Sequence, residues 1–174
     1  PMTVLTTSAD VAALCERLSN TAYVTVDTEF MRESTYWAKL CLVQIAGPEE
    51  SAAIDPLAPN IDLTPLFDLL ANPDVLKEFH AARQDLEIFH HLTGEVPHPI
   101  FDSQVAAMVC GFGDSVAYDT LASRLADAHI DKSSRFTDWA RRPLTERQIG
   151  YALADVIHLR PIYDKLSHML EKNG

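Results

Sequence analysis

The segment 21–30, TAYVTVDTEF, places two acidic residues inside a run that is otherwise typical of a β-strand. Side chains alternate between the two faces of a strand, so Asp27 and Glu29 point to the same face. Strands seldom carry acids so close together, because like charges repel and acidic residues fit a pleated surface poorly. Either this end of the strand is hydrated, or a divalent cation offsets the repulsion.

The rest of the chain shows two successive patterns of secondary structure. An early helix is followed by three strands with short connections, which predicts an antiparallel start to the sheet. After residue 64, helical and strand segments alternate, and the expected architecture is an α/β fold with a mixed sheet flanked by helices. The strands are expected at 2–5, 21–30, 40–46, 52–54, 75–79 and 100–101, and the helices at 7–18, 64–70, 83–92, 103–110, 117–126 and 145–166.

Several helix boundaries can be predicted from capping residues. Thr64 is expected to cap a helix whose first position is Pro65. Thr145 and Gln148 form a capping-box pattern at the start of a long closing helix. Pro161 should kink that helix, because its ring removes a backbone hydrogen bond one turn back. The polar and aromatic segment 32–39 is expected to form a turn or an exposed hairpin tip.

Length and composition favour one globular domain over residues 1–174. No apolar run in the sequence approaches the length of a membrane span. The net charge of −11 argues against a nucleic-acid coat protein, whose affinity comes from cations. It leaves room for an enzyme whose bound metals reverse the local field. Cys15, Cys41 and Cys110 are far apart among apolar residues, so we expect buried, reduced thiols in a cytoplasmic protein.

A third acid lies on the core-facing stripe of the helix predicted over 83–92. Asp85 shares this stripe with Ile88 and Phe89, at helical spacings of three and four residues. An unpaired carboxylate is costly to bury, so its presence there needs a reason. The ordinary explanation is that backbone amides near the helix start satisfy Asp85.

A fourth acid lies on the predicted closing helix. Asp155 follows Tyr151 by four residues, which stacks the two side chains on one face of the helix. The ordinary explanation for Asp155 is an ion pair with a neighbouring base, either Arg160 or His158. Tyr151 alone would be read as a tyrosine at the boundary of the core.

The four acids are more informative together than singly. If they converge, they repel one another strongly unless cations are bound between them. Ligand sets made only of oxygen select hard ions, so Mg²⁺ or Mn²⁺ is favoured over zinc. Two such ions can hold the attacking and leaving oxygens of an in-line phosphoryl displacement.

Three segments resemble the exonuclease motifs of the ribonuclease D family, in the tyrosine branch of the DEDD 3′-5′ exonucleases. These segments are 26–30 (VDTEF), 80–87 (HAARQDLE) and 151–156 (YALADV). Four more match in the family's order, namely 42–45 (LVQI), 54–57 (IDPL), 101–104 (FDSQ) and 138–144 (DWARRPL). An Asp-x-Glu strand alone is a weak signal, but three ordered motifs over nearly the whole chain are a strong one.

The resemblance implies a ribonuclease H-like α/β fold and 3′ to 5′ hydrolysis of single-stranded RNA ends, such as those of tRNA precursors. Nucleoside 5′-monophosphates would be released. Two divalent cations, Mg²⁺ or Mn²⁺, would be held by Asp27, Glu29, Asp85 and Asp155. Tyr151 would position the attacking water. Phe30 would lie near the terminal nucleotide, and core packing is the alternative for it.

The one basic concentration in this acidic chain comprises Arg135, Arg141, Arg142 and Arg147. We expect Arg135 and Arg142 to contact phosphates, the alternative being a solvated loop with local ion pairs.

The sequence leaves the substrate class open. A DNA exonuclease of the same superfamily would carry the same motifs, because contacts to the 2′-hydroxyl are local. A nonenzymatic RNA-binding domain is a third reading that the fold alone would permit, although the intact carboxylates and tyrosine argue against it. Longer family members carry helical C-terminal RNA-binding domains, so this sequence is either a truncated chain or a short stand-alone form with weaker RNA affinity.

Overall fold

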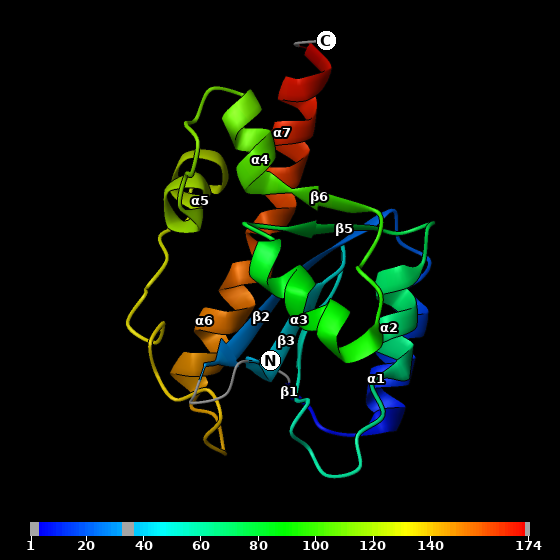
Figure 1. The fold of residues 1–174 in the computed structure, drawn as a ribbon. Helices are drawn as coiled ribbons and strands as arrows, with labels where there is room; N and C mark the ends of the chain where they lie inside the picture. Colours follow the sequence, from blue (N-terminus) through cyan, green and yellow to red (C-terminus); the bar gives the residue numbers. More distant parts are fainter. Residues whose placement is uncertain (1–3, 33–36, 173–174) are drawn as a thin grey trace.

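The computed structural model describes residues 4–32 and 37–172, and its centre is a six-stranded sheet in the order β1-β4-β3-β2-β5-β6 (Figure 1). The strands are β1 (Val4–Leu5), β2 (Tyr23–Met31), β3 (Lys39–Ala46), β4 (Ser51–Ile54), β5 (Leu76–Phe79) and β6 (Ile100–Asp102). β2, β3 and β4 pair antiparallel, whereas β1–β4, β2–β5 and β5–β6 pair parallel. The predicted mixed sheet with an antiparallel start is therefore confirmed.

Helices cover both faces of this sheet. They are α1 (Ser8–Leu18), α2 (Thr64–Ala71), α3 (Arg83–Thr93), α4 (Ser103–Val109), α5 (Tyr118–Ala126), α6 (Glu146–Ile157) and α7 (Leu159–Lys172). α1, α2 and α3 share a hydrophobic core with one face of β2 and β3, to which Val24, Val26 and Ile45 contribute. α6 packs on the other face, and α4, α5 and α7 form a second core beside it (Figure 1).

The long closing helix that we predicted is divided into two. α6 ends at Ile157 and α7 begins at Leu159, so the break falls at His158 and not at Pro161. Pro161 has no N–H to donate to the carbonyl of Ile157, one turn earlier, and it lies in the first turn of α7, where that donor is not needed. The break therefore lies at the backbone bond that Pro161 removes, as predicted, but the chain forms two helices there and not one kinked helix.

The N-cap of α2 lies one residue before the predicted position. Thr64 is already helical, Leu63 occupies the N-cap position, and the Asp62 carboxylate accepts the Thr64 N–H at 2.9 Å. The capping box of α6 is present as predicted, with Thr145 accepting from the backbone of Gln148. The predictions for residues 2–3 and 33–36 fall outside the described residues.

The three cysteines are free, but only two of them are buried. Cys15 and Cys41 lie in the core, whereas Cys110, at the end of α4, is partly exposed. Our prediction of three buried thiols was therefore wrong for Cys110. None of the helices in residues 4–32 and 37–172 combines the length and the apolar character that crossing a membrane requires.

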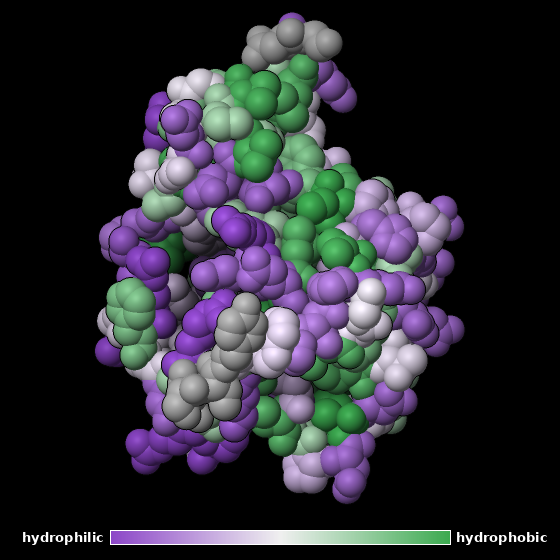
Figure 2. Space-filling view, viewed as in Figure 1, coloured by the Kyte–Doolittle hydropathy of each residue, from purple (hydrophilic) through white to green (hydrophobic). Residues whose placement is uncertain are grey.

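Exposed hydrophobic side chains gather along one edge of the sheet. Figure 2 shows green surface over α4, continuing toward β6. The side chains of Ile100, Val105, Met108 and Val109 are each at least two-fifths exposed. β6 is an edge strand and β5 separates it from β2, the strand that carries the paired acids, so this apolar strip lies away from the acids.

Candidate active site

Strand β2 and helix α6 bring three of the four predicted acids together. Asp27, Glu29 and Asp155 each contribute one carboxylate oxygen, and these three oxygens lie within 4.8 Å of one another. The helix is tied to the strand next to these acids, because the Thr25 hydroxyl donates to the Val156 carbonyl at 2.7 Å. Asp27 and Glu29 therefore face α6, as the alternation along the strand predicted.

Asp85 approaches from the other face of the sheet. It lies in the first turn of α3, and it accepts a hydrogen bond from the hydroxyl of Thr28, whose side chain points away from α6. Asp85 does not join the group of ligand atoms formed by the other three acids. Its charge nevertheless helps to raise the pKa of Asp27, so the two carboxylates are near neighbours.

The start of α3 is fixed by a residue whose role the sequence did not indicate. Asp102, at the end of β6, accepts the backbone N–H groups of both Ala81 and Ala82 at 2.9 Å. Ala81 has a φ of 55°, a conformation that side-chain-bearing residues seldom adopt, and these bonds help to stabilise it. An acid directly after a short strand, inside the matching segment 101–104, was the only signal in the sequence.

Burial dominates the electrostatics of the acids. It raises the pKa of Glu29 to about 9, with the neighbouring Asp27 charge adding to the effect. It raises the pKa of Asp155 to about 8 and that of Asp85 to about 7. Burial and the charges of Asp155 and Asp85 raise the pKa of Asp27 well above its usual range.

The acids are surrounded by protein but are not sealed. Asp85 and Asp155 are 6% and 8% exposed, whereas Asp27 and Glu29 keep more of their surface accessible. A cavity of about 390 Å³ is lined by Asp27, Tyr151 and Asp155. The acids therefore have low-dielectric surroundings on most sides and an opening on one side, which lets an ion or a substrate reach them.

The donor set fits a hard divalent cation. All three grouped ligands are carboxylate oxygens, which Mg²⁺ and Mn²⁺ prefer. Oxygens on opposite sides of a Mg²⁺ ion are about 4 Å apart, since each lies about 2.1 Å from the ion. The observed separations of up to 4.8 Å are of this size, so a small adjustment of rotamers would close the set around an ion.

Tyr151 lies one turn before Asp155 and is half-buried beside the same cavity. Its ring packs near Trp139, with the ring centroids 6.1 Å apart. Burial, reinforced by the charges of Asp155 and Glu29, raises the pKa of the Tyr151 phenol above its usual range. At neutral pH this side chain is therefore a neutral hydroxyl that can donate or accept a hydrogen bond.

A second tyrosine, Tyr118, also lines the cavity. The Tyr118 hydroxyl donates to the Ala154 carbonyl at 2.6 Å, which anchors α6 immediately before Asp155. His80 packs edge-on against Tyr118 and lies 2.8 Å from both the Ser103 hydroxyl and the Val116 carbonyl. These contacts link the segment before α3 to α6, and no pattern in the sequence indicates this role of Tyr118.

The predicted basic residues separate into two roles. Arg135 lines the cavity beside Tyr151 and is exposed. Arg142 instead forms a bidentate pair with Asp55, at 2.9 and 3.1 Å, and also donates to the carbonyls of Cys41 and Trp139. Its donors hold the 139–142 loop to the sheet, so the structure favours the ion-pair alternative for Arg142.

Two further alternatives from the sequence can be compared with the structure. Phe30 is half-buried and packs against the core on the α1–α3 face, with the Arg32 guanidinium 5.7 Å from its ring centroid. Asp155 does not pair with Arg160, whose guanidinium donates to the carbonyls of Tyr23 and Ala46. Core packing thus describes Phe30 well, whereas the ion-pair explanation for Asp155 was wrong.

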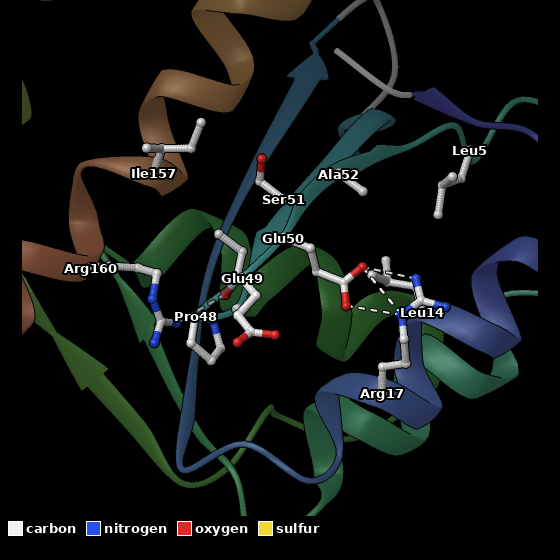
Figure 3. A pocket seen from close by; sticks show the side chains of 12 residues that line it. Leu5, Leu14, Arg17, Pro48, Glu49, Glu50, Ser51, Ala52, Ile157 and Arg160 are labelled. Atoms are coloured by element: carbon white, nitrogen blue, oxygen red, sulfur yellow. Dashed lines mark hydrogen bonds and ion pairs between the residues drawn. The ribbon is translucent and has the colours of Figure 1, made fainter. Parts of the chain in front are cut away.

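A larger hollow of about 760 Å³ lies at the β3–β4 turn, away from the acids (Figure 3). Figure 3 shows Glu50 turned toward Arg17, with which it forms an ion pair at 2.9 Å. Arg160, on the other side of the hollow, is bound to backbone carbonyls. Because these charged groups are already paired, size alone does not make this hollow a candidate for catalysis.

A mixed α/β sheet carries an oxygen-only cluster on its central strand, with a fourth acid and a tyrosine beside it. The 3′-5′ exonuclease family model matches residues 2–171, so the chain belongs to that family.

Individual relatives place the chain more narrowly. A ribonuclease D from Granulibacter bethesdensis is 59% identical over 99% of this chain. This chain spans only 44% of that protein, and less than half of each of the first curated relatives it matches. The predicted resemblance to the ribonuclease D family is thereby confirmed.

Solved structures agree with this placement. Escherichia coli RNase D, described as an exoribonuclease involved in structured RNA processing, matches with a TM-score of 0.93 and 40% identity, over 97% of this chain and 45% of that chain. Brucella melitensis NrnC with bound Mg²⁺ matches with a TM-score of 0.81 and 27% identity, over 99% and 81% of the two chains. The ribonuclease H-like α/β fold is therefore confirmed.

Proposed function

We propose that residues 1–174 form the catalytic domain of a metal-dependent 3′-5′ exoribonuclease, which removes nucleoside 5′-monophosphates from single-stranded RNA ends such as those of tRNA precursors. One observation carries this proposal: carboxylate oxygens of Asp27, Glu29 and Asp155 lie within 4.8 Å of one another beside an open cavity. The likeness to E. coli RNase D, whose description names structured RNA processing, supports RNA as the substrate class.

In this proposal the four acids hold two divalent cations, Mg²⁺ or Mn²⁺. Such ions, when bound, stabilise charge on the attacking and leaving oxygens of a phosphoryl displacement. Asp27, Glu29 and Asp155 form one ligand group, and Asp85 supplies the fourth carboxylate from α3. The Mg²⁺ bound in NrnC supports this choice of ion.

Tyr151 has the role of orienting the attacking water. Its hydroxyl lies beside Asp155 at the cavity, and its pKa is raised, so the neutral phenol is the form that acts. A neutral hydroxyl aligns a water by hydrogen bonding, and correct alignment can lower a barrier by several kcal/mol. The proton released by the water must therefore be taken up by a group other than a phenolate.

The substrate strand needs cations in an otherwise acidic chain. Arg135 lies at the cavity and forms no ion pair with a carboxylate of the described residues, so we assign it to a phosphate of the terminal nucleotides. Phe30 is a weaker candidate for contact with the terminal base, because its ring packs into the core. Arg142 has no assigned substrate contact in this proposal.

The test uses 5′-labelled single-stranded RNA and DNA of one sequence, with Mn²⁺ or with EDTA. We expect a ladder that shortens from the 3′ end of the RNA, only when Mn²⁺ is present. Faster shortening of the DNA would favour a DNA exonuclease, and no cleavage of either strand under saturating Mn²⁺ would favour a nonenzymatic binding domain.

A second arm tests the requirement for an end. The same RNA is supplied as a circle and with a 3′-phosphate, and both should be degraded much more slowly than the form with a free 3′-hydroxyl. Cleavage of the circle at the rate of the linear RNA would indicate an endonuclease and would contradict the proposal.

A further inference from the structure

Gln44 is the polar exception in strand β3. Its neighbours in the segment 40–46, LCLVQIA, are all apolar, and its side chain is fully buried. Gln44 is the direct partner of Asp27 in the antiparallel β2–β3 ladder. Residues paired in this way present their side chains on the same face, so Gln44 lies on the face of Asp27 and Glu29.

The amide of Gln44 reaches one of the acids. Its Nε2 donates to Glu29 Oε1 at 3.2 Å. Its carbonyl oxygen, Oε1, is buried and has no hydrogen-bond partner within the described part of the chain. Because an unmatched buried acceptor costs stability, a methionine of similar length would suit this apolar strand better. The fold itself therefore gives no reason for a glutamine here.

The Glu29 carboxylate needs a hydrogen-bond donor to fix its position. The ladder between β2 and β3 shifts register between Glu29 and Phe30, and such an irregularity re-aims the side chains next to it. A glutamate side chain has three rotatable bonds, so its carboxylate is not held by the backbone alone. A buried N–H donor on the neighbouring strand restricts those rotations and favours the ionised carboxylate.

We propose that Gln44 is a positioning residue, which fixes the Glu29 carboxylate toward Asp27 and Asp155 so that the three acids bind a divalent cation. This inference rests on the proposed function, because it assumes that the acids are metal ligands. Groups that orient metal ligands through hydrogen bonds typically change metal affinity about 10- to 100-fold when they are removed. Gln44 thus contributes to ion binding at the expense of stability in the metal-free fold.

The test substitutes Gln44→Met, which keeps the length of the side chain and removes the donor. Gln44→Leu serves as a second variant, in case methionine packs poorly. The control is Gln84→Met, the same chemical change at an exposed glutamine on α3. Calorimetric titration of Mn²⁺ into the metal-free proteins gives Kd, and urea unfolding gives the stability of the same samples.

We expect Gln44→Met to raise the Mn²⁺ Kd about tenfold or more, with metal-free stability unchanged or higher, and Gln84→Met to leave both unchanged. RNA cleavage by the Gln44 variants should recover as the Mn²⁺ concentration is raised. An unchanged Kd in both Gln44 variants would overturn the inference alone. If both Gln44 variants lose metal-free stability in proportion to their loss of Mn²⁺ affinity, the role of Gln44 is merely structural, and this result would also overturn the inference. A wild-type protein that binds no Mn²⁺ would overturn the metal site itself, and this inference with it.

Discussion

Two buried acidic regions of the sheet differ in what surrounds them. Asp27, Glu29 and Asp155 face one another beside a cavity, and their oxygens form one group. Glu78, in β5, is fully buried, and neither of its carboxylate oxygens has a hydrogen-bond partner in the described residues. Burial raises the pKa of Glu78 well above its usual range, and the Arg160 charge opposes this shift only in part.

The comparison shows that a high cost of burial does not by itself mark a functional site. Both regions are unfavourable for charge, but only the cluster has several ligand atoms within 4.8 Å of one another and an opening to solvent. A cation can offset the repulsion in the cluster, whereas the described residues give Glu78 no such group of ligands.

The first prediction removes one charge from the cluster by Asp155→Asn. We expect single-turnover cleavage of RNA to fall about 10³-fold or more, because a lost metal ligand removes several kcal/mol of charge stabilisation. Mn²⁺ affinity, measured by calorimetry, should fall as well. The metal-free protein should become more stable, since one of the mutually repelling acids is gone.

The control for this change is Asp68→Asn, which removes an exposed charge on α2. Both cleavage and Mn²⁺ binding should stay at the wild-type level in this control. An Asp155→Asn protein that binds Mn²⁺ as tightly as wild type would show that Asp155 is not a ligand.

The second prediction uses Tyr151→Phe to distinguish the role of the tyrosine hydroxyl from that of the acids. The ring and its packing near Trp139 remain, so stability and Mn²⁺ affinity should change little. Turnover should fall about 10²-fold if the hydroxyl aligns the water. The control is Tyr163→Phe, which removes the same atom from a ring that packs against Tyr23 and Phe101. Wild-type cleavage by Tyr151→Phe would leave only a packing role for Tyr151.

The sequence predicted the elements better than it predicted their contacts. Period-two alternation was sufficient to place Asp27 and Glu29 on one face of β2, and the capping box located the start of α6. Helical spacing put Asp155 on the inner face of its helix. These are local regularities, and local regularities are what a single sequence carries.

The features that the sequence did not predict have a common physical origin in long-range contacts. Helical spacing placed Asp85 on the inner stripe of its helix, but its hydrogen bond from Thr28, 57 positions away, follows from how α3 packs on the sheet. Arg142 was expected to contact phosphate, but its partner Asp55 is 87 positions away in the sequence. The burial of Glu78 could not be predicted, because the short segment 75–79 does not indicate which of its side chains are enclosed.

The third prediction concerns the pH dependence of the metal-free protein. Burial raises the pKa values of Asp85, Asp155 and Glu29 to about 7, 8 and 9, above those of the unfolded chain. The folded state therefore holds protons that the unfolded state releases, and stability falls as pH rises from about 4, the pKa of these acids in the unfolded chain, to their raised values in the fold. From pH 5 to pH 8 in EDTA, we expect urea unfolding to show a loss on the order of 2 kcal/mol.

Saturating Mn²⁺ should weaken or reverse this pH dependence, because the ion favours the ionised carboxylates and adds about 2.7 kcal/mol of stability at one hundred times its Kd. Asp155→Asn in EDTA should show a shallower loss than wild type. If metal-free stability instead rises from pH 5 to pH 8, the cluster does not dominate the acid–base behaviour of the fold.

The last prediction concerns the isolated acid. Glu78→Val places a residue that favours strands at a fully buried position of β5, and it removes a carboxyl group with no hydrogen-bond partner among the described residues. We expect the free energy of unfolding at pH 7.5 to rise by about 1 kcal/mol or more. Glu78→Gln should give a smaller gain, because it removes the charge but leaves a buried polar group. The gain from valine should shrink toward pH 4, where Glu78 is protonated in the unfolded chain too and the cost of its raised pKa disappears. Mn²⁺ affinity should not change in either variant, because Glu78 is not one of the grouped ligands. Loss of stability in both variants would mean that Glu78 has a favourable contact in solution. Glu78 would then not be an isolated acid that differs from the cluster of Asp27, Glu29 and Asp155.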